Sequence, residues 1–92
     1  MILSFGNKET EQLWVAERSR HYGNIARVAL RKLLQLHAAD NLRDLAVPPG
    51  NRLEALSGRR KGQHSIRINE QWRICFIWTP NGPEKVIICD YH

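Results

Sequence analysis

The fold is decided by residues 65–91, SIRINEQWRICFIWTPNGPEKVIICDY. Apolar and polar side chains alternate around Arg67 and again around Arg73, which is the period-two pattern of strands with one apolar face. Turn-forming residues in Thr79–Pro83 predict a hairpin loop, and a last strand is expected over Lys85–Tyr91. We therefore expect an antiparallel meander whose second face carries both arginines.

Two registers of the last hairpin are compatible with this pattern. One places Arg73 opposite Asp90, and a slip of one residue places Arg73 opposite Tyr91 and Cys75 opposite Cys89. We interpret both cysteines as buried thiols, because the chain has only these two, with no CxxC pair and no secretory signal. A cross-strand disulfide between them is the alternative.

A first helix is expected near the N-terminus, after the short apolar segment Met1–Phe5, which has β character. Asn7 can cap this helix, and acidic residues in its first turn suit the helix dipole. Basic residues from Arg18 to His21 suit its C-terminal end, before Gly23. The pattern thus predicts a helix that extends to these basic residues.

A second helix has a clearer apolar face. Asn24 can cap it, and its other face carries Arg27, Arg31 and Lys32, which is typical of a solvated surface but also suits an acidic partner. Asp40–Gly50 contains two prolines and is expected to connect the helices to the sheet. The apolar stripe of the helix, at i, i+3 and i+4 spacing, consists of Ile25, Val28, Ala29, Leu33 and Leu36.

This order of elements predicts an α+β domain in which two N-terminal helices pack on one face of a small, mainly antiparallel sheet. A chain of 92 residues supports one core, so we expect residues 1–92 to form a single domain, and a multi-domain enzyme is excluded. No apolar run approaches the ~20 residues that cross a bilayer, and Lys8 and Glu9 interrupt the N-terminal one. We therefore expect a cytoplasmic protein that makes no membrane contact.

The composition is basic, with 14 lysines and arginines against 9 acidic residues and a net charge of +5. Such an excess indicates a polyanionic partner, such as a nucleic acid or an acidic protein. Most of the excess lies in residues 51–73, where only Glu54 and Glu70 are acidic. The basic residues of this segment are Arg52, Arg59, Arg60, Lys61, Arg67 and Arg73.

These basic residues occur in two settings. Residues 59–61 form a loop between glycines that can present three cations to a phosphate backbone, and a solubilising surface loop is the alternative. Arg67 and Arg73 extend from a sheet face and need an anion beside them. Asp90 or Glu54 could supply that anion within the chain, which would make the pairing purely structural.

The chain ends in Asp90, Tyr91 and His92. A histidine with a reference pKa of ~6.5 can transfer protons near neutral pH, and a tyrosine hydroxyl can relay one. With Arg67 and Arg73 as charge stabilisers, these groups suit the cleavage of a phosphodiester without a metal, and a frayed tail is the alternative. The sequence has no Walker loop, nucleophile elbow or HExxH pattern, so we expect neither a metal nor a cofactor.

Several motifs together match one family. They are Met-Ile-x-Ser-Phe at 1–5, Asn-Arg-Leu-Glu-Ala-Leu at 51–56, Gly-Gln-His-Ser-Ile-Arg at 62–67, Gln-Trp-Arg-Ile at 71–74 and Asp-Tyr-His at 90–92. With them the chain resembles HigB-type toxins of the RelE/ParE superfamily, most closely the GraT-like members, over essentially its whole length. The resemblance implies a RelE/ParE-like fold and a toxin that enters the ribosomal A site, cleaves translated mRNA and so inhibits translation.

The resemblance also implies the partners of such a toxin. Besides the ribosome and mRNA, they include a cognate antitoxin, a HigA-like helix-turn-helix protein that binds the toxin and helps to repress their shared operon. Operator DNA would then be contacted only through the toxin-antitoxin complex.

Individual site residues follow from the same resemblance. Arg73 matches the strand arginine of the family, Asp90, Tyr91 and His92 match its C-terminal functional residues, and Arg67 is a companion of Arg73. These five are the expected catalytic residues. The expected RNA-binding residues are Arg59, Arg60, Lys61 and Arg52.

The chain departs from some characterised relatives at Glu54 and Ser57, where those proteins have a histidine and a lysine. The departure removes two basic groups near the scissile phosphate. A non-enzymatic ParE-like inhibitor of DNA gyrase and a small RNA-binding protein are the alternative functions. His92 favours the nuclease, because a gyrase blocker needs no proton-transfer residue.

Overall fold

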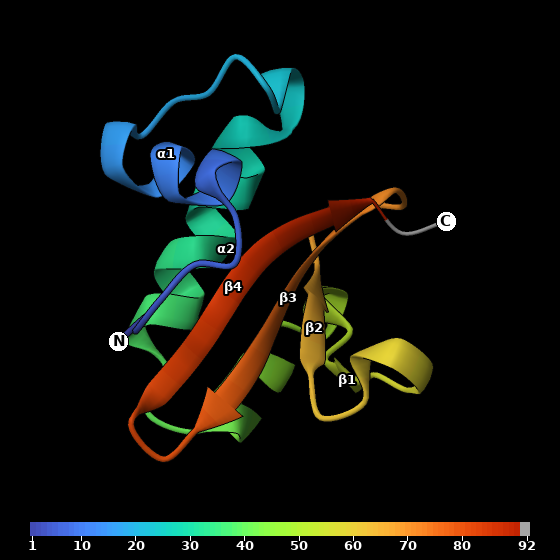
Figure 1. Ribbon diagram of the computed structural model, residues 1–92. Helices are drawn as coiled ribbons and strands as arrows, with labels where there is room; N and C mark the ends of the chain where they lie inside the picture. Colours follow the sequence, from blue (N-terminus) through green and yellow to red (C-terminus); the bar gives the residue numbers. More distant parts are fainter. Residues whose placement is uncertain (91–92) are drawn as a thin grey trace.

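Two helices precede an antiparallel sheet in the computed structural model of the protein, which describes residues 1–90 (Figure 1). Helix α1 spans Lys8–Ala16 and helix α2 spans Ala26–Ala38. The sheet has the strand order β1-β2-β3-β4, and each neighbouring pair is antiparallel, which confirms the α+β class. The strands are β1 (Glu54–Ala55), β2 (His64–Arg67), β3 (Trp72–Thr79) and β4 (Gly82–Asp90).

The apolar core joins the helices to the sheet. Helix α1 contacts β4, and α2 contacts both β3 and β4. Ile66, Ile74 and Ile88 lie directly opposite one another on β2, β3 and β4, and they are buried in one cluster with Leu33 and Leu36 of α2. Burying one such side chain stabilises the fold by ~1.5–3 kcal/mol relative to leaving it exposed. The apolar stripe predicted for the second helix therefore faces the core as expected, although Ile25 lies in the turn before α2 and Val28 is only partly buried.

The opposite face of the sheet, which we call the site face, carries polar and sulfur-bearing side chains. Residues directly opposite each other on neighbouring strands share a face. One row on the site face consists of Arg67, Arg73 and Cys89, from β2, β3 and β4. The expectation that both arginines share the second face is thus confirmed. A second row consists of Glu54, Ser65, Cys75 and Ile87.

The first helix is shorter than the sequence predicts. Asn7 caps it as expected, because its side-chain oxygen accepts a hydrogen bond from the backbone N–H of Thr10 at 2.9 Å. The helix ends at Ala16, since Glu17 adopts a left-handed conformation with φ 59° that closes the last turn. The prediction that basic residues 18–21 belong to this helix is therefore wrong.

The second helix begins without the predicted side-chain cap. A short 3-10 turn, η1 (Gly23–Ile25), continues directly into α2, so Asn24 lies inside that turn and Ile25 occupies the cap position. The prediction of an Asn24 cap is wrong for this reason. The resulting helix has 13 residues, and no helix within residues 1–90 is long and apolar enough to cross a membrane.

The register of the last hairpin differs from both predicted alternatives. Arg73 lies opposite Cys89, and Asp90 lies opposite Trp72. The pairing of Arg73 with Asp90 is therefore wrong, and so is the register in which Cys75 lies opposite Cys89. Instead, the two cysteines are diagonal neighbours on the site face.

Turn geometry explains this register. Thr79 pairs with Gly82, so the hairpin loop is shorter than the predicted Thr79–Pro83. Between Glu84 and Ile87, β4 then contains one more residue than the facing part of β3. This is a β-bulge, and Lys85 within it has φ 52°. The bulge shifts every later pair by one position, an effect that alternation alone does not reveal.

The N-terminal segment lies along β4 and shows the expected β character. Phe5 forms a parallel bridge with Val86, and the N–H of Leu3 donates to the carbonyl of Pro83 at 2.8 Å. Figure 1 shows this segment, in dark blue, beside β4. Because of this pairing, β4 has neighbours on both sides along part of its length.

Candidate functional site

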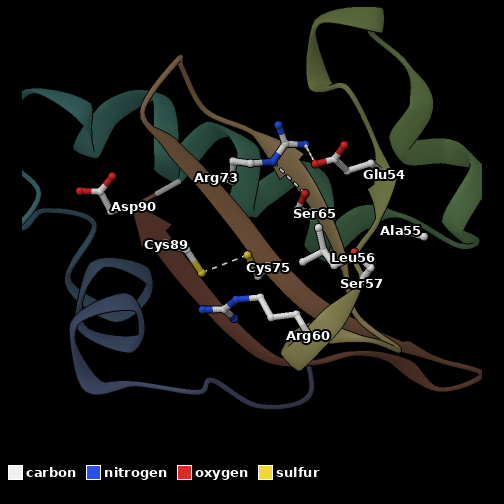
Figure 2. Close-up of a pocket in the computed structure, with 10 residues that line it drawn as sticks. All are labelled: Glu54, Ala55, Leu56, Ser57, Arg60, Ser65, Arg73, Cys75, Cys89 and Asp90. Atoms are coloured by element: carbon white, nitrogen blue, oxygen red, sulfur yellow. Dashed lines mark hydrogen bonds and ion pairs between the residues drawn. The ribbon is translucent and has the colours of Figure 1, made fainter. Parts of the chain in front are cut away.

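An open pocket of about 530 Å³, which we call the site pocket, lies over the site face. Its lining comes from β1, β2, β3, β4 and the loop between β1 and β2 (Figure 2). Strands that are distant in sequence therefore contribute reactive groups to one cavity. The titratable lining residues are Glu54, Arg60, Arg73, Cys75, Cys89 and Asp90.

Arg73 lines this pocket although its side chain is only 10% exposed. Its Nε donates to Oγ of Ser65 at 2.8 Å, and its Nη2 donates to the carbonyl oxygen of Arg52 at 2.7 Å. Nη2 also lies 3.6 Å from Oε1 of Glu54, an ion pair that Figure 2 shows together with the Ser65 contact. Contacts from both sides thus fix the plane of the guanidinium. Of the two carboxylates that the sequence offered as an internal anion, Glu54 therefore forms an ion pair with Arg73, as the structural alternative supposed.

A second arginine lies directly opposite Arg73. This is Arg67, on β2, and the two side chains line another open pocket of about 360 Å³ together with Arg52 and Glu70. Like charges that face each other on neighbouring strands repel. An anion bound between them removes this repulsion, and a phosphate can accept two parallel hydrogen bonds from a guanidinium. Arg73 therefore connects two pockets that suit a phosphate chain.

The basic loop between β1 and β2 reaches the site pocket through one residue. Arg60 lines the pocket, and its Nη1 donates to Oε1 of Gln63 at 3.4 Å. Arg59 and Lys61 are exposed and, in the described chain, do not line the pocket. The structure thus brings one of the three predicted loop cations to the site and leaves the other two on the outer surface.

Asp90 lines the site pocket at the end of β4. Its Oδ2 accepts a hydrogen bond from Nε2 of Gln71 at 3.1 Å. Tyr91 and His92, which the sequence also assigns to the site, lie outside the described residues. They directly follow a pocket-lining residue in sequence.

Cys75 and Cys89 contact each other in the site pocket. Their Sγ atoms are 3.0 Å apart in a hydrogen bond, and no disulfide joins them. This hydrogen bond, together with burial, raises the pKa of the Cys75 thiol well above its usual range. The same hydrogen bond and the charge of Arg60 lower the pKa of Cys89 to about 7, against the opposite effect of burial. Cys75 is buried as predicted, whereas Cys89 is only half-buried, so that part of the prediction is wrong.

The described residues contain few candidate metal ligands that lie close together. Residues 1–90 contain no group of three or more His, Cys, Asp or Glu side chains that could hold a metal ion. The two cysteines supply two sulfur ligands, whereas a structural zinc site uses four ligands and a catalytic one uses three.

Several of the pocket residues, among them Ser65, Cys75 and Cys89, were not predicted as site residues from the sequence. Ser65 precedes Arg67 by two positions, so strand alternation could have placed it on the same face. The position of Cys89 could not be predicted from alternation, because its place opposite Arg73 depends on the register of the hairpin. The bulge in β4 decides that register.

Comparison with known proteins identifies a family. A sequence profile described as RelE-like toxin of type II toxin-antitoxin system HigB matches residues 3–92. Toxin HigB-1 of Vibrio cholerae serotype O1 is 41% identical over 81 residues, which cover 86% of this chain and 85% of that toxin. An uncharacterized protein of Haemophilus influenzae is 38% identical over 58 residues, which cover 63% of this chain and 57% of that protein. The chain therefore belongs to the HigB-like family of RelE-like toxins of type II toxin-antitoxin systems.

Proposed function

We propose that residues 1–92 act as one toxin domain, a metal-independent endoribonuclease that cleaves mRNA in the A site of translating ribosomes. The observation that carries this proposal is Arg73, a nearly buried guanidinium held by Ser65, Glu54 and a backbone carbonyl. A cation fixed in this way stabilises charge that develops on a phosphate without having to reorganise. The activity would inhibit translation in the cytoplasm.

In the proposed reaction the ribose 2′-hydroxyl of the mRNA attacks the adjacent phosphate. Arg73 stabilises the negative charge that builds on the phosphate oxygens. His92 acts as general acid or base, and Tyr91 and Asp90 support this proton transfer. Arg67, opposite Arg73 on β2, adds a second guanidinium close to the phosphate.

The RNA backbone would lie across the two pockets of the site face. Arg60 in the site pocket and Arg52 in the neighbouring pocket are the cations at either side of Arg73. Arg59 and Lys61, exposed on the loop, extend this positive surface. Phosphate contacts of this kind position a nucleic acid without reading its sequence.

Glu54 has to be displaced before a phosphate can replace it beside Arg73. Its side chain is 45% exposed and 3.6 Å from Nη2 of Arg73, so water can solvate the carboxylate when the phosphate arrives. The phosphate brings its own negative charge, so the nearly buried guanidinium keeps a counter-ion throughout the exchange. The acid in place of a basic residue is therefore compatible with phosphate binding.

Replacing Arg73 tests the proposal. Arg73→Ala should lower the single-turnover rate of mRNA cleavage on ribosomes by about 10²- to 10³-fold, as removal of one charge-stabilising donor does in other enzymes. Arg27→Ala is the matched control, because Arg27 is an exposed arginine of α2 that lines neither the site pocket nor the neighbouring pocket between Arg67 and Arg73. Primer extension on purified translation complexes measures both rates, and circular dichroism verifies folding. A folded Arg73→Ala protein that cleaves at the wild-type rate would refute the assignment.

We further propose that the cognate antitoxin is a HigA-like helix-turn-helix protein and that operator DNA is bound only through the complex. The net charge of +5 favours a partner with an acidic contact surface. Association should be fast and should slow as salt is added, since exposed charges act over ~10 Å at 0.1 M ionic strength. Co-expression with the neighbouring open reading frame should yield a stable complex. A chain that is harmless when expressed alone and co-purifies with nothing would contradict the toxin assignment.

A further inference from the structure

Two thiols occupy the site pocket, although the proposed cleavage of RNA uses neither. Cys75 and Cys89 are the only cysteines of the chain, and their Sγ atoms lie 3.0 Å apart on the site face. An S–S bond is ~2.05 Å long, so the sulfur atoms would have to approach by about 1 Å to form one. Figure 2 shows both side chains directed toward each other from β3 and β4. The two sulfur atoms of the reduced protein are thus in direct contact, within a short movement of the bonding distance.

We propose that Cys89 and Cys75 form a reversible oxidation site, at which a hydroperoxide such as hydrogen peroxide converts the two thiols into an intramolecular disulfide. Cys89 is the residue that reacts with the peroxide, and Cys75 is the residue that resolves the product. This inference concerns the sulfur chemistry of the chain and does not depend on cleavage of RNA.

The environments of the two sulfur atoms assign these roles. Cys89 is half-buried and lines an open pocket, so a small oxidant can reach it, whereas Cys75 is buried. Arg60 lines the same pocket, and its positive charge stabilises a thiolate at Cys89. Thiolates rather than thiols react with peroxide, and low-pKa, accessible cysteines next to a second cysteine are the ones that oxidise selectively.

The reaction proceeds in two balanced steps. The Cys89 thiolate attacks one peroxide oxygen, the O–O bond breaks, and the sulfur is oxidised to a sulfenic acid while the released hydroxide takes up a proton to give water. The Cys75 sulfur then attacks Sγ of Cys89, the S–O bond breaks, and the departing hydroxide leaves as water with the proton of Cys75. In total the two thiols lose two electrons and two protons, and one hydrogen peroxide becomes two waters.

Peptide mapping of the purified full chain tests this proposal directly. Trypsin cleaves after Arg73 and Lys85, which separates the cysteines into peptides 74–85 and 86–92. After exposure to one equivalent of hydrogen peroxide, the unreduced digest should contain these two peptides joined by a disulfide, and a thiol reductant should separate them again. The intact protein should remain a monomer on a non-reducing gel. Persistence of both free thiols, or a disulfide between two chains, would overturn the proposal.

Serine variants separate the roles of the two cysteines. In Cys75→Ser the resolving sulfur is absent, so the sulfenic acid at Cys89 should persist and be trapped by dimedone. In Cys89→Ser, Cys75 should keep its thiol and react at least ~10-fold more slowly than Cys89 does in the wild type, because Cys75 is buried and burial limits both the access of peroxide and the formation of a thiolate. Equal oxidation of Cys75 in Cys89→Ser would contradict the order of attack. If a variant fails to fold, the wild-type peptide map still shows whether Cys75 and Cys89 form a disulfide.

Discussion

Arg73 is oriented by the fold before any ligand arrives. Ser65 and the backbone carbonyl of Arg52 each accept one of its hydrogen bonds at 2.8 and 2.7 Å. A guanidinium has five N–H donors in a planar fork, which suits the recognition of an oxyanion. A lysine at this position could provide a charge but not the fixed fork. The arginine thus combines a structural role in the sheet with the proposed role at the phosphate.

His92 carries the proton-transfer part of the proposal, and its replacement is the corresponding test. His92→Ala should lower ribosome-bound cleavage by about 10²- to 10⁴-fold, because a positioned acid or base typically contributes that much. His21→Ala is the matched control, since His21 is exposed and does not line the site pocket. If folded His92→Ala cleaves as fast as the control, His92 has no part in the reaction.

The Cys89 thiol should show an unusual pH dependence. Its pKa is lowered to about 7, so the reactive thiolate forms as the pH rises through that value. Alkylation by iodoacetamide should therefore increase between about pH 6 and pH 8 and then level off, whereas an ordinary cysteine with a pKa of ~8.5 continues to gain reactivity at higher pH. Mass spectrometry of peptide 86–92 measures this rate. A midpoint at or above ~8.5 would contradict the lowered pKa.

Among the elements, β4 connects the core to the site. Ile88 points into the core, and its N–H donates to Oγ1 of Thr10 on α1 at 3.0 Å. The next residue, Cys89, lies on the site face opposite Arg73. Because side chains alternate along a strand, the contacts that fix Ile88 also fix the orientation of Cys89. The packing of α1 against β4 thereby helps to orient Cys89 toward the pocket.

The end of α1 offers a test of its local geometry. Glu17→Gly should stabilise the protein by about 0.5–1 kcal/mol, because glycine adopts the left-handed conformation at φ 59° without a Cβ clash. Removing a negative charge from the helix C-terminus acts in the same direction. Ala16→Gly is the control one residue earlier, and it should destabilise the helix by about 0.5–1 kcal/mol. Urea unfolding measures both changes, and a loss of stability in Glu17→Gly equal to that in Ala16→Gly would contradict this description.

The sequence predicted those elements whose pattern is local. The period-two strands and the apolar stripe of α2 follow from side-chain spacing, and both are confirmed. The end of α1 escaped prediction because the charges of residues 18–21 suit a helix that the left-handed Glu17 terminates. The left-handed conformation of Glu17 ends the helix there although the charges that follow would suit a longer one.

The site was predictable in part for the same reason. Alternation placed Arg67 and Arg73 on one face, and family motifs added the terminal residues. The hydrogen bond between Arg73 and Ser65 and the contact between Cys75 and Cys89 needed the register across strands. That register depends on a bulge in β4, which leaves no periodic signal in the sequence.

At the scale of the whole molecule, its small size limits how firmly the toxin alone can hold an RNA strand. The described chain measures 31 × 27 × 26 Å. The site pocket and the neighbouring pocket between Arg67 and Arg73 are both open on its surface. An RNA strand lying on the site face would be contacted from one side only. Orientation of the reacting groups supplies much of enzymatic catalysis, and a loosely held strand loses that contribution. In the proposed function, the ribosome would supply this orientation by fixing the mRNA in the A site.

The most direct measurement is therefore the single-turnover cleavage rate of one mRNA, compared between a purified translating complex and the same mRNA free in solution. We predict cleavage in the ribosomal complex at a rate at least ~10³-fold above that of the free mRNA, in keeping with the large contribution of fixed orientation. Primer extension should place the cut in the codon that occupies the A site. Equal rates on free and ribosome-bound mRNA, or no cleavage in the complex, would contradict the account.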